Sequence, residues 1–101
     1  MKSIIQEKKE CFVTGRRDTL EEHHIFRGPN RKHSEKYGLK VWLIKVLHDP
    51  SIPGSVHADP KGEINQLILR AGQMAFERVH GSRELFVKIF RRNWLDGGAA
   101  C

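Results

Sequence analysis

The sequence predicts an α+β fold in which strand-forming segments come first and two helices follow. Residues 11–62 are rich in histidine, glycine and proline, and they contain runs of β-branched and aromatic residues. Residues 63–95 have apolar side chains at intervals of three and four, which is the spacing of a buried helix face. A chain of 101 residues is long enough for one modest core. A single domain is therefore expected over residues 11–95, with an N-terminal extension (1–10) and a flexible tail (96–101).

In the first part, residues 11–14 and 19–26 are each expected to form a strand. The turn at 15–18 would join them as a β-hairpin. Residues 28–30 read as a turn, and a helical turn is expected in 31–37, ended by Gly38. The run 39–44 is again β-type, and the loop at 49–54 contains two prolines that exclude a helix.

In the second part, a helix is expected to begin at Glu63 and to end at Gly81. Ser82 can then cap a second helix. Trp94 and Leu95 are expected to fold back onto the same core. The predicted buried face of the first helix consists of Ile64, Leu67, Ile68, Ala71, Ala75 and Val79, and that of the second of Leu85, Phe86, Ile89 and Phe90.

The composition favours a polyanionic partner and excludes a membrane-spanning chain. Lysine and arginine number 18 against 12 acidic residues, which leaves a net charge of +6. Such a surplus favours nucleic acid, because each phosphate contact releases condensed counterions. No apolar run approaches the roughly 20 residues of a membrane helix. Residues 1–10 lack the apolar region of a signal peptide, so a cytoplasmic location with reduced thiols is expected, and a Cys11–Cys101 disulfide is not.

Histidine is the unusual residue, with six in the chain. His23 and His24 are adjacent on a predicted strand, so their side chains point to opposite faces, and one can hold a metal while the other acts as a general base. The loop that follows His48 can return His57 to its neighbourhood. Three imidazoles with an open position are typical of a catalytic metal site, whereas a structural site usually has four ligands with cysteine pairs. The alternative is that one histidine packs against the sheet and its neighbour is solvated.

Several ordered motifs resemble those of small phage-encoded HNH nucleases, including the recombination-enhancement nucleases. The likeness covers most of residues 9–95. The motifs are Cys11-Phe-Val-Thr-Gly, Glu22-His-His-Ile-Phe, Ser34-Glu-Lys-Tyr-Gly-Leu-Lys-Val-Trp-Leu, His48, Val56-His57 and Gln73-Met-Ala-Phe-Glu-Arg-Val-His-Gly-Ser-Arg-Glu-Leu-Phe.

The resemblance implies a ββα-metal core in residues 11–62 around one divalent ion (Mg²⁺, Mn²⁺ or Zn²⁺), followed by a helical region over 63–95. It implies that His23, His48 and His57 are the ligands and that His24 is the general base. The partner would be DNA, processed in the cytoplasm of the phage's host. Relatives often have Asn where this chain has Asp49. An Asn can orient the base through a neutral hydrogen bond, whereas the carboxylate of Asp49 would raise the pKa of the base or join the metal shell. Asn30 is an alternative orienting residue.

Four cations follow the histidine pair and are expected to contact phosphates: Arg27, Arg31, Lys32 and Lys36. His33 and His80 match no motif ligand and are expected to be surface or helix residues. Two other readings stay open: a zinc-stabilised nucleic-acid-binding module without catalysis, and a DNA-binding helix pair in 63–95 with incidental histidines. The choice between nicking and double-strand cleavage also stays open. A homodimer would explain double-strand cleavage most simply.

Overall fold

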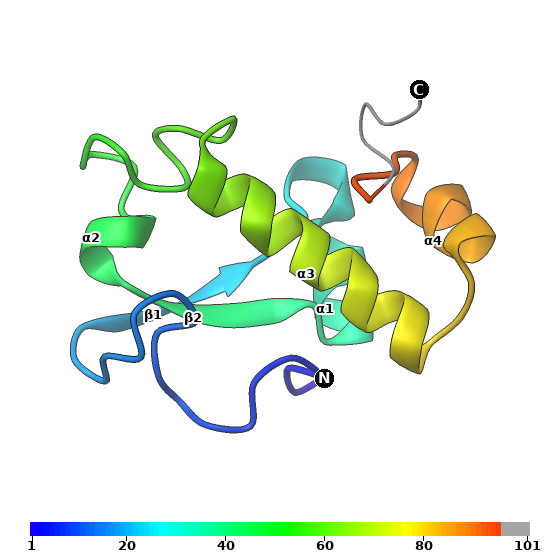
Figure 1. Ribbon diagram of the computed structural model, residues 1–101, viewed down its shortest axis with the longest axis horizontal. Helices are drawn as coiled ribbons and strands as arrows, with labels where there is room; N and C mark the ends of the chain where they lie inside the picture. Colours follow the sequence, from blue (N-terminus) through cyan, green and yellow to red (C-terminus); the bar gives the residue numbers. More distant parts are fainter. Residues whose placement is uncertain (96–101) are drawn as a thin grey trace.

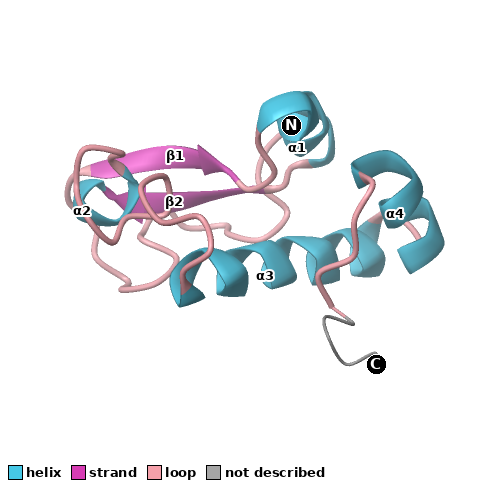
Figure 2. Cartoon of the chain, turned by 90° about the horizontal axis from the view of Figure 1, so that it is seen from above, coloured by secondary structure: helices cyan, strands magenta, loops and turns pink. Residues whose placement is uncertain are grey.

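The computed structural model describes residues 1–95, and it confirms the α+β class (Figure 1). Strands β1 (Leu20–His24) and β2 (Lys40–Ile44) pair antiparallel, with His23 opposite Val41. The remaining elements are the short 3-10 helix η1 (Gly28–Asn30) and the helices α1 (Arg31–Tyr37), α2 (Lys45–His48), α3 (Glu63–Val79) and α4 (Arg83–Phe90). Figure 2 shows α3 running alongside the strands, with α2 and α4 at opposite ends of the molecule.

The predicted hairpin between residues 11–14 and 19–26 is wrong. Residues 12–14 form a turn, and the partner of β1 is β2, which lies beyond α1 in the chain. Gly15 closes the turn with a positive φ of 77°, and its backbone N–H donates to the carbonyl of Cys11 at 2.8 Å. Within residues 11–14, only the N–H of Phe12 donates to β2, at the carbonyl of Trp42 (2.8 Å). The turn then carries the chain away from β2, so no strand forms here.

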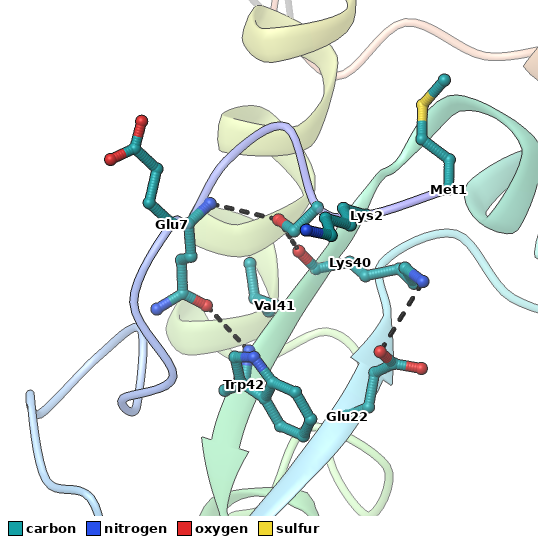
Figure 3. A pocket seen from close by; sticks show the side chains of 9 residues that line it. Met1, Lys2, Glu7, Glu22, Lys40, Val41 and Trp42 are labelled. Atoms are coloured by element: carbon teal, nitrogen blue, oxygen red, sulfur yellow. Dashed lines mark hydrogen bonds and ion pairs between the residues drawn. The ribbon is translucent and has the colours of Figure 1, made fainter.

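The N-terminal residues cover the edge of β2 that β1 leaves free. The Ser3 hydroxyl donates to the carbonyl of Lys40 at 2.6 Å, and the backbone N–H of Trp42 donates to Gln6 Oε1 at 2.8 Å. Figure 3 shows this segment crossing beside the strand. An exposed edge is a template for unwanted pairing. The predicted extension is thus packed against the domain and satisfies its edge.

Helix α1 is held against the end of β1 by a buried hydroxyl. Ser34 Oγ donates to the carbonyl of Phe26 at 2.8 Å and accepts from its N–H at 2.9 Å. Gly38 ends the helix as predicted, with a φ of 73° in the left-handed region that glycine tolerates. This short excursion returns the chain to pair β2 with β1.

Helix α2 is a single turn that the sequence did not predict, placed directly after β2. The loop beyond it folds back, because the N–H of Val56 donates to the carbonyl of Leu47 at 2.8 Å. Ser55 and Val56 are buried. The returning loop brings His57 beside His48, as the sequence predicted.

Helices α3 and α4 form at the predicted positions, but the buried face of α3 is rotated. Leu67 and Val79, which were expected in the core, are 50% and 53% exposed. Gly72 faces the core instead, and a Cβ there would lie only 3.0 Å from Ile25 Cγ2 and Phe26 Cε2. This close approach of α3 to the two residues that follow β1 fixes the rotation. The buried residues of α3 are Asn65, Ile68, Leu69, Gly72, Gln73, Ala75 and Phe76.

An aromatic cluster joins the two helices to the end of β1. Phe26, Phe76, Phe86 and Phe90 are all buried, and Phe86 stacks on Phe90 with 4.5 Å between ring centres. Trp94 packs on Phe26 as expected, at 4.9 Å. Ser82 caps α4 by accepting from the N–H of Leu85, although the Leu85 side chain itself is 39% exposed. The predicted tail, 96–101, lies outside the described residues. Over residues 1–95, no helix combines the length and apolar character needed to cross a bilayer.

Candidate metal centre

Three histidines from separate segments meet beside β1. His23 comes from β1, His48 ends α2, and His57 lies in the returning loop. Each offers a ring nitrogen, and these atoms all lie within 4.8 Å of one another. Two nitrogens bound to the same ion at about 2.0–2.1 Å are at most roughly 4.2 Å apart. The arrangement therefore needs only small side-chain movements to hold a divalent metal.

His23 is the buried member of the group. It is 1% exposed, and neither ring nitrogen has a hydrogen-bond partner among the described residues. Burial lowers the pKa of His23 to about 3, and the neighbouring His48 and His57 act in the same direction. The imidazole is therefore neutral at physiological pH, which is the form that ligates metals. Because buried polar atoms are almost always paired, this unpartnered ring fits a site in which one of its nitrogens binds an ion.

A chain of hydrogen bonds fixes the other two rings. A guanidinium can only donate, so Arg27 donates to His57 Nδ1, and a carboxylate can only accept, so Glu21 Oε1 accepts from His48 Nδ1 at 2.8 Å. His57 Nε2 and His48 Nε2 lie 3.0 Å apart and share a proton, which His57 donates. Burial, with Arg27 next in importance, lowers the pKa of His57. The Nε2 atoms of His48 and His57 are thus held together, with both rings 5.2 Å from that of His23 between centres.

His24 is held by a carboxylate on the neighbouring helix. Its Nε2 lies 3.0 Å from Glu35 Oε1, and the carboxylate must accept this bond. Nδ1 is then the unprotonated nitrogen of neutral His24. Glu35 Oε2 also accepts hydrogen bonds from the N-terminal ammonium at 2.9 Å and from Lys40 Nζ at 3.2 Å. These hydrogen bonds, with that from His24 the largest, lower the pKa of Glu35 to about 2.

The two residues predicted to orient the base have other contacts. Asp49 Oδ1 accepts from the N–H and the hydroxyl of Ser51 at 2.8 and 2.7 Å, and these bonds lower the pKa of Asp49. It closes a local turn after α2. Asn30 Nδ2 donates to the carbonyl of Phe90 at 3.1 Å, which ties η1 to the end of α4. In this structure the carboxylate that contacts His24 is Glu35.

The histidines line a pocket of about 320 Å³ together with two of the predicted phosphate-binding cations. Arg27 and Arg31 both face it. Lys32 and Lys36 are exposed on α1, and Lys36 Nζ lies 5.3 Å from the centre of the Tyr37 ring. A larger pocket, of about 550 Å³, lies between the N-terminal segment and β2 (Figure 3). Two of its charged side chains pair, since Lys40 Nζ lies 3.6 Å from Glu22.

Sequence reasoning missed Glu21 and Glu35, which hold His48 and His24. Glu21 lies two residues before His23 on β1, so alternation along the strand was a signal that could have placed it on the same face. Glu22, His24 and Glu35 also converge within 4.8 Å. Lys40 Nζ lies within 3.6 Å of both carboxylates, and the N-terminal ammonium lies 2.9 Å from Glu35, so two positive charges balance the two carboxylates of this second group.

His33 and His80 lie outside both groups. The ring of His33 packs edge-on against Phe90, and His80 Nε2 lies 2.9 Å from the carbonyl of Tyr37.

No protein-family model, curated protein or solved structure matches the chain. The case for function therefore depends on the geometry of the site.

Proposed function

We propose that the protein is a metal-dependent endonuclease of the HNH type that hydrolyses phosphodiester bonds in DNA. The observation that carries the proposal is that two adjacent histidines of β1 lie in different environments. His23 is buried with both nitrogens unpartnered beside His48 and His57, and the adjacent His24 is held at Nε2 by Glu35. The proposal is also supported by the one-turn helix α2 that follows the antiparallel pair of β1 and β2, although η1 and α1 lie between the two strands in the chain.

His23, His48 and His57 would hold one divalent ion, and their chemistry fits that role. All three are imidazoles, the side chains that Zn²⁺ and related ions accept most often. Glu21 orients His48 through its other ring nitrogen, as carboxylates commonly do for metal-bound histidines. When bound, the ion would neutralise charge on the scissile phosphate and stabilise the leaving 3′ oxygen.

His24 supplies the base in this proposal. With its Nε2–H donated to Glu35, Nδ1 carries the lone pair that can take a proton from water. The hydroxide formed attacks the phosphorus, and the bond to the 3′ oxygen breaks. Glu35 acts through His24, because it fixes the tautomer and the orientation of the ring and does not itself touch the substrate.

Arg27 and Arg31 would position the phosphate in the same pocket. They are the two cations that line it with the histidines. Such contacts fix the position of the backbone and carry no sequence information.

The test is a plasmid-cleavage assay with Mg²⁺, Mn²⁺ or Zn²⁺, with and without a chelator. The parent protein should nick or cut the plasmid only with metal. His24→Ala should bind the ion as the parent does and lose cleavage by a factor of about 10² or more, the contribution typical of a general base. His33→Ala, a histidine outside the site, should cut normally. Full activity of His24→Ala would remove His24 from the role.

The alternative of a zinc-stabilised binding module makes different predictions. It would leave the parent inactive with every ion, while chelation would unfold the protein and abolish DNA binding. Active protein with Mg²⁺ or Mn²⁺ excludes this alternative.

A further inference from the structure

A second pocket, of about 420 Å³, adjoins the metal centre. It lies between the residues that follow β1, the start of α3 and the segment 92–94. Arg27 lines both this pocket and that of the histidines. In Figure 1 the red segment at the end of the described chain lies beside the cyan η1 turn, where it forms one wall. The volume is within the range of about 300–1,000 Å³ that small-molecule sites occupy.

The charged groups of this pocket are all positive. Arg27, Lys61 and Arg92 line it, and no carboxylate is among the described residues that do. Lys61 and Arg92 are exposed, and neither has an ion-pair partner in residues 1–95. The pocket beside β2, in contrast, pairs Lys40 with Glu22. Unpaired cations converging without acidic residues favour an anionic ligand.

The pocket also presents planar surfaces. Trp94 packs on Phe26 at 4.9 Å, and the guanidinium of Arg92 lies 5.3 Å from the centre of the Trp94 ring. The segment is anchored, because the N–H of Trp94 donates to Gln73 Oε1 at 2.7 Å. Aromatic rings and guanidinium planes are the surfaces on which unstacked nucleobases bind. A simple anion has no planar surface to stack on an indole, so the ring favours a ligand that contains a base.

We propose that this nucleotide pocket (Phe26, Arg27, Lys61, Gln66, Arg92 and Trp94) binds an unpaired nucleotide next to the bond that is cut. The base stacks at Trp94, and its phosphates lie at Lys61 and Arg92. Arg27 connects the nucleotide pocket to the metal centre. A base within a duplex is stacked on its neighbours and reaches a pocket only when it is extruded. The protein therefore prefers single-stranded or locally opened DNA.

The position of the cut depends on the proposed nuclease function, but binding does not, so the test is run in EDTA without cleavage. In a Trp42→Phe background, Trp94 is the only tryptophan of the chain. Its fluorescence is followed while a single-stranded oligonucleotide or the matching duplex is added. The single strand should bind more tightly. Lys61→Gln and Arg92→Gln should each reduce the slope of log K against log salt by about 0.7, one phosphate contact on a single strand. Arg78→Gln, an exposed cation of α3 that lines neither pocket, is the matched control.

The role of the base is tested with dAMP against deoxyribose 5-phosphate. In an NMR titration, dAMP should shift the indole N–H signal of Trp94 further than deoxyribose 5-phosphate does. Trp94→Phe, which keeps a smaller aromatic ring against Phe26, should weaken single-strand binding about threefold, less than the roughly fivefold lower limit for complete loss of one stacked base. If Trp94→Phe does not fold, the two glutamine variants and the dAMP titration carry the test.

Equal shifts from the two small ligands, tighter binding of the duplex, or equal slopes for Lys61→Gln, Arg92→Gln and Arg78→Gln would overturn the nucleotide pocket. Normal single-strand binding by a protein that never cuts DNA would overturn the proposed nuclease function alone.

Discussion

Replacing His23 by leucine should stabilise the metal-free protein. His23 is 1% exposed and has two ring nitrogens without partners. An unsatisfied buried polar group costs roughly 1–3 kcal/mol. Leucine fills a similar volume with no polar atom, so His23→Leu should raise the free energy of unfolding by about 2 kcal/mol, the sum of the two lower-limit costs. Binding sites commonly sacrifice stability in this way.

Metal should reverse the order of the two proteins. An ion that binds only the native state stabilises it by roughly 4.1 kcal/mol when its free concentration is about 1,000 times Kd. The parent should gain this stability and His23→Leu should gain none.

The assay is urea unfolding in EDTA and in excess Mn²⁺ or Zn²⁺. His80→Leu is the control, since it loses the contact with the Tyr37 carbonyl outside the site. That variant should be less stable than the parent in EDTA and should still respond to metal. A His23→Leu protein that is less stable than the parent in EDTA, or that metal stabilises, would refute the reasoning.

Three further predictions concern Glu35 and the packing of α3. The carboxyl of Glu35 should titrate far below an ordinary glutamate in ¹³C NMR, because its pKa is lowered from 4.5 to about 2. Since the folded pKa is the lower one, its stabilising effect is present above pH 4.5 and is lost as the pH falls toward 2, so acid unfolding of Glu35→Gln should lack this component. Glu35→Ala should slow metal-dependent cleavage about tenfold or more, while Glu35→Gln, whose amide oxygen can still accept from His24, should retain more activity; equal rates for the two variants would contradict the positioning role. Gly72→Ala should lower the free energy of unfolding by about 1–3 kcal/mol through overpacking, as measured by urea denaturation. Met74→Ala, on the exposed side of α3, should change it by less than about 0.5 kcal/mol, and equal losses would contradict the packing described.

Local signals predicted the elements whose ends depend on neighbouring residues. Gly38 ends α1 and Ser82 begins α4, because backbone conformation and capping are decided within one turn. The rotation of α3 was not predictable in this way. Leu67 fits the apolar spacing of the helix, and Gly72 carries no apolar signal at all. Nevertheless, contact with the end of β1 requires the glycine to face inward, and Leu67 is exposed. The single turn of α2 also escaped prediction, since four residues carry too little periodicity.

The grouping of His23, His48 and His57 was predictable because few residue types bind metals, and they are conspicuous in a sequence. Their supporting contacts were not. Glu35 reaches His24 only because α1 packs beside β1, and exposed glutamates on helices are common. Long-range partners of this kind depend on the tertiary arrangement.

The contact between Arg27 and His57 couples the binding of the ion to the binding of DNA. His57 accepts from Arg27 at Nδ1 and carries its proton on Nε2. If Nε2 ligates an ion, the proton of the neutral ring must move to Nδ1, which can then no longer accept from Arg27. If Nδ1 ligates, the guanidinium is displaced directly. In both cases binding of the ion frees Arg27, which lines both pockets. Conversely, a phosphate that draws Arg27 away leaves His57 Nδ1 without its hydrogen bond to the guanidinium. Ion and DNA should therefore each increase the affinity for the other by the same factor.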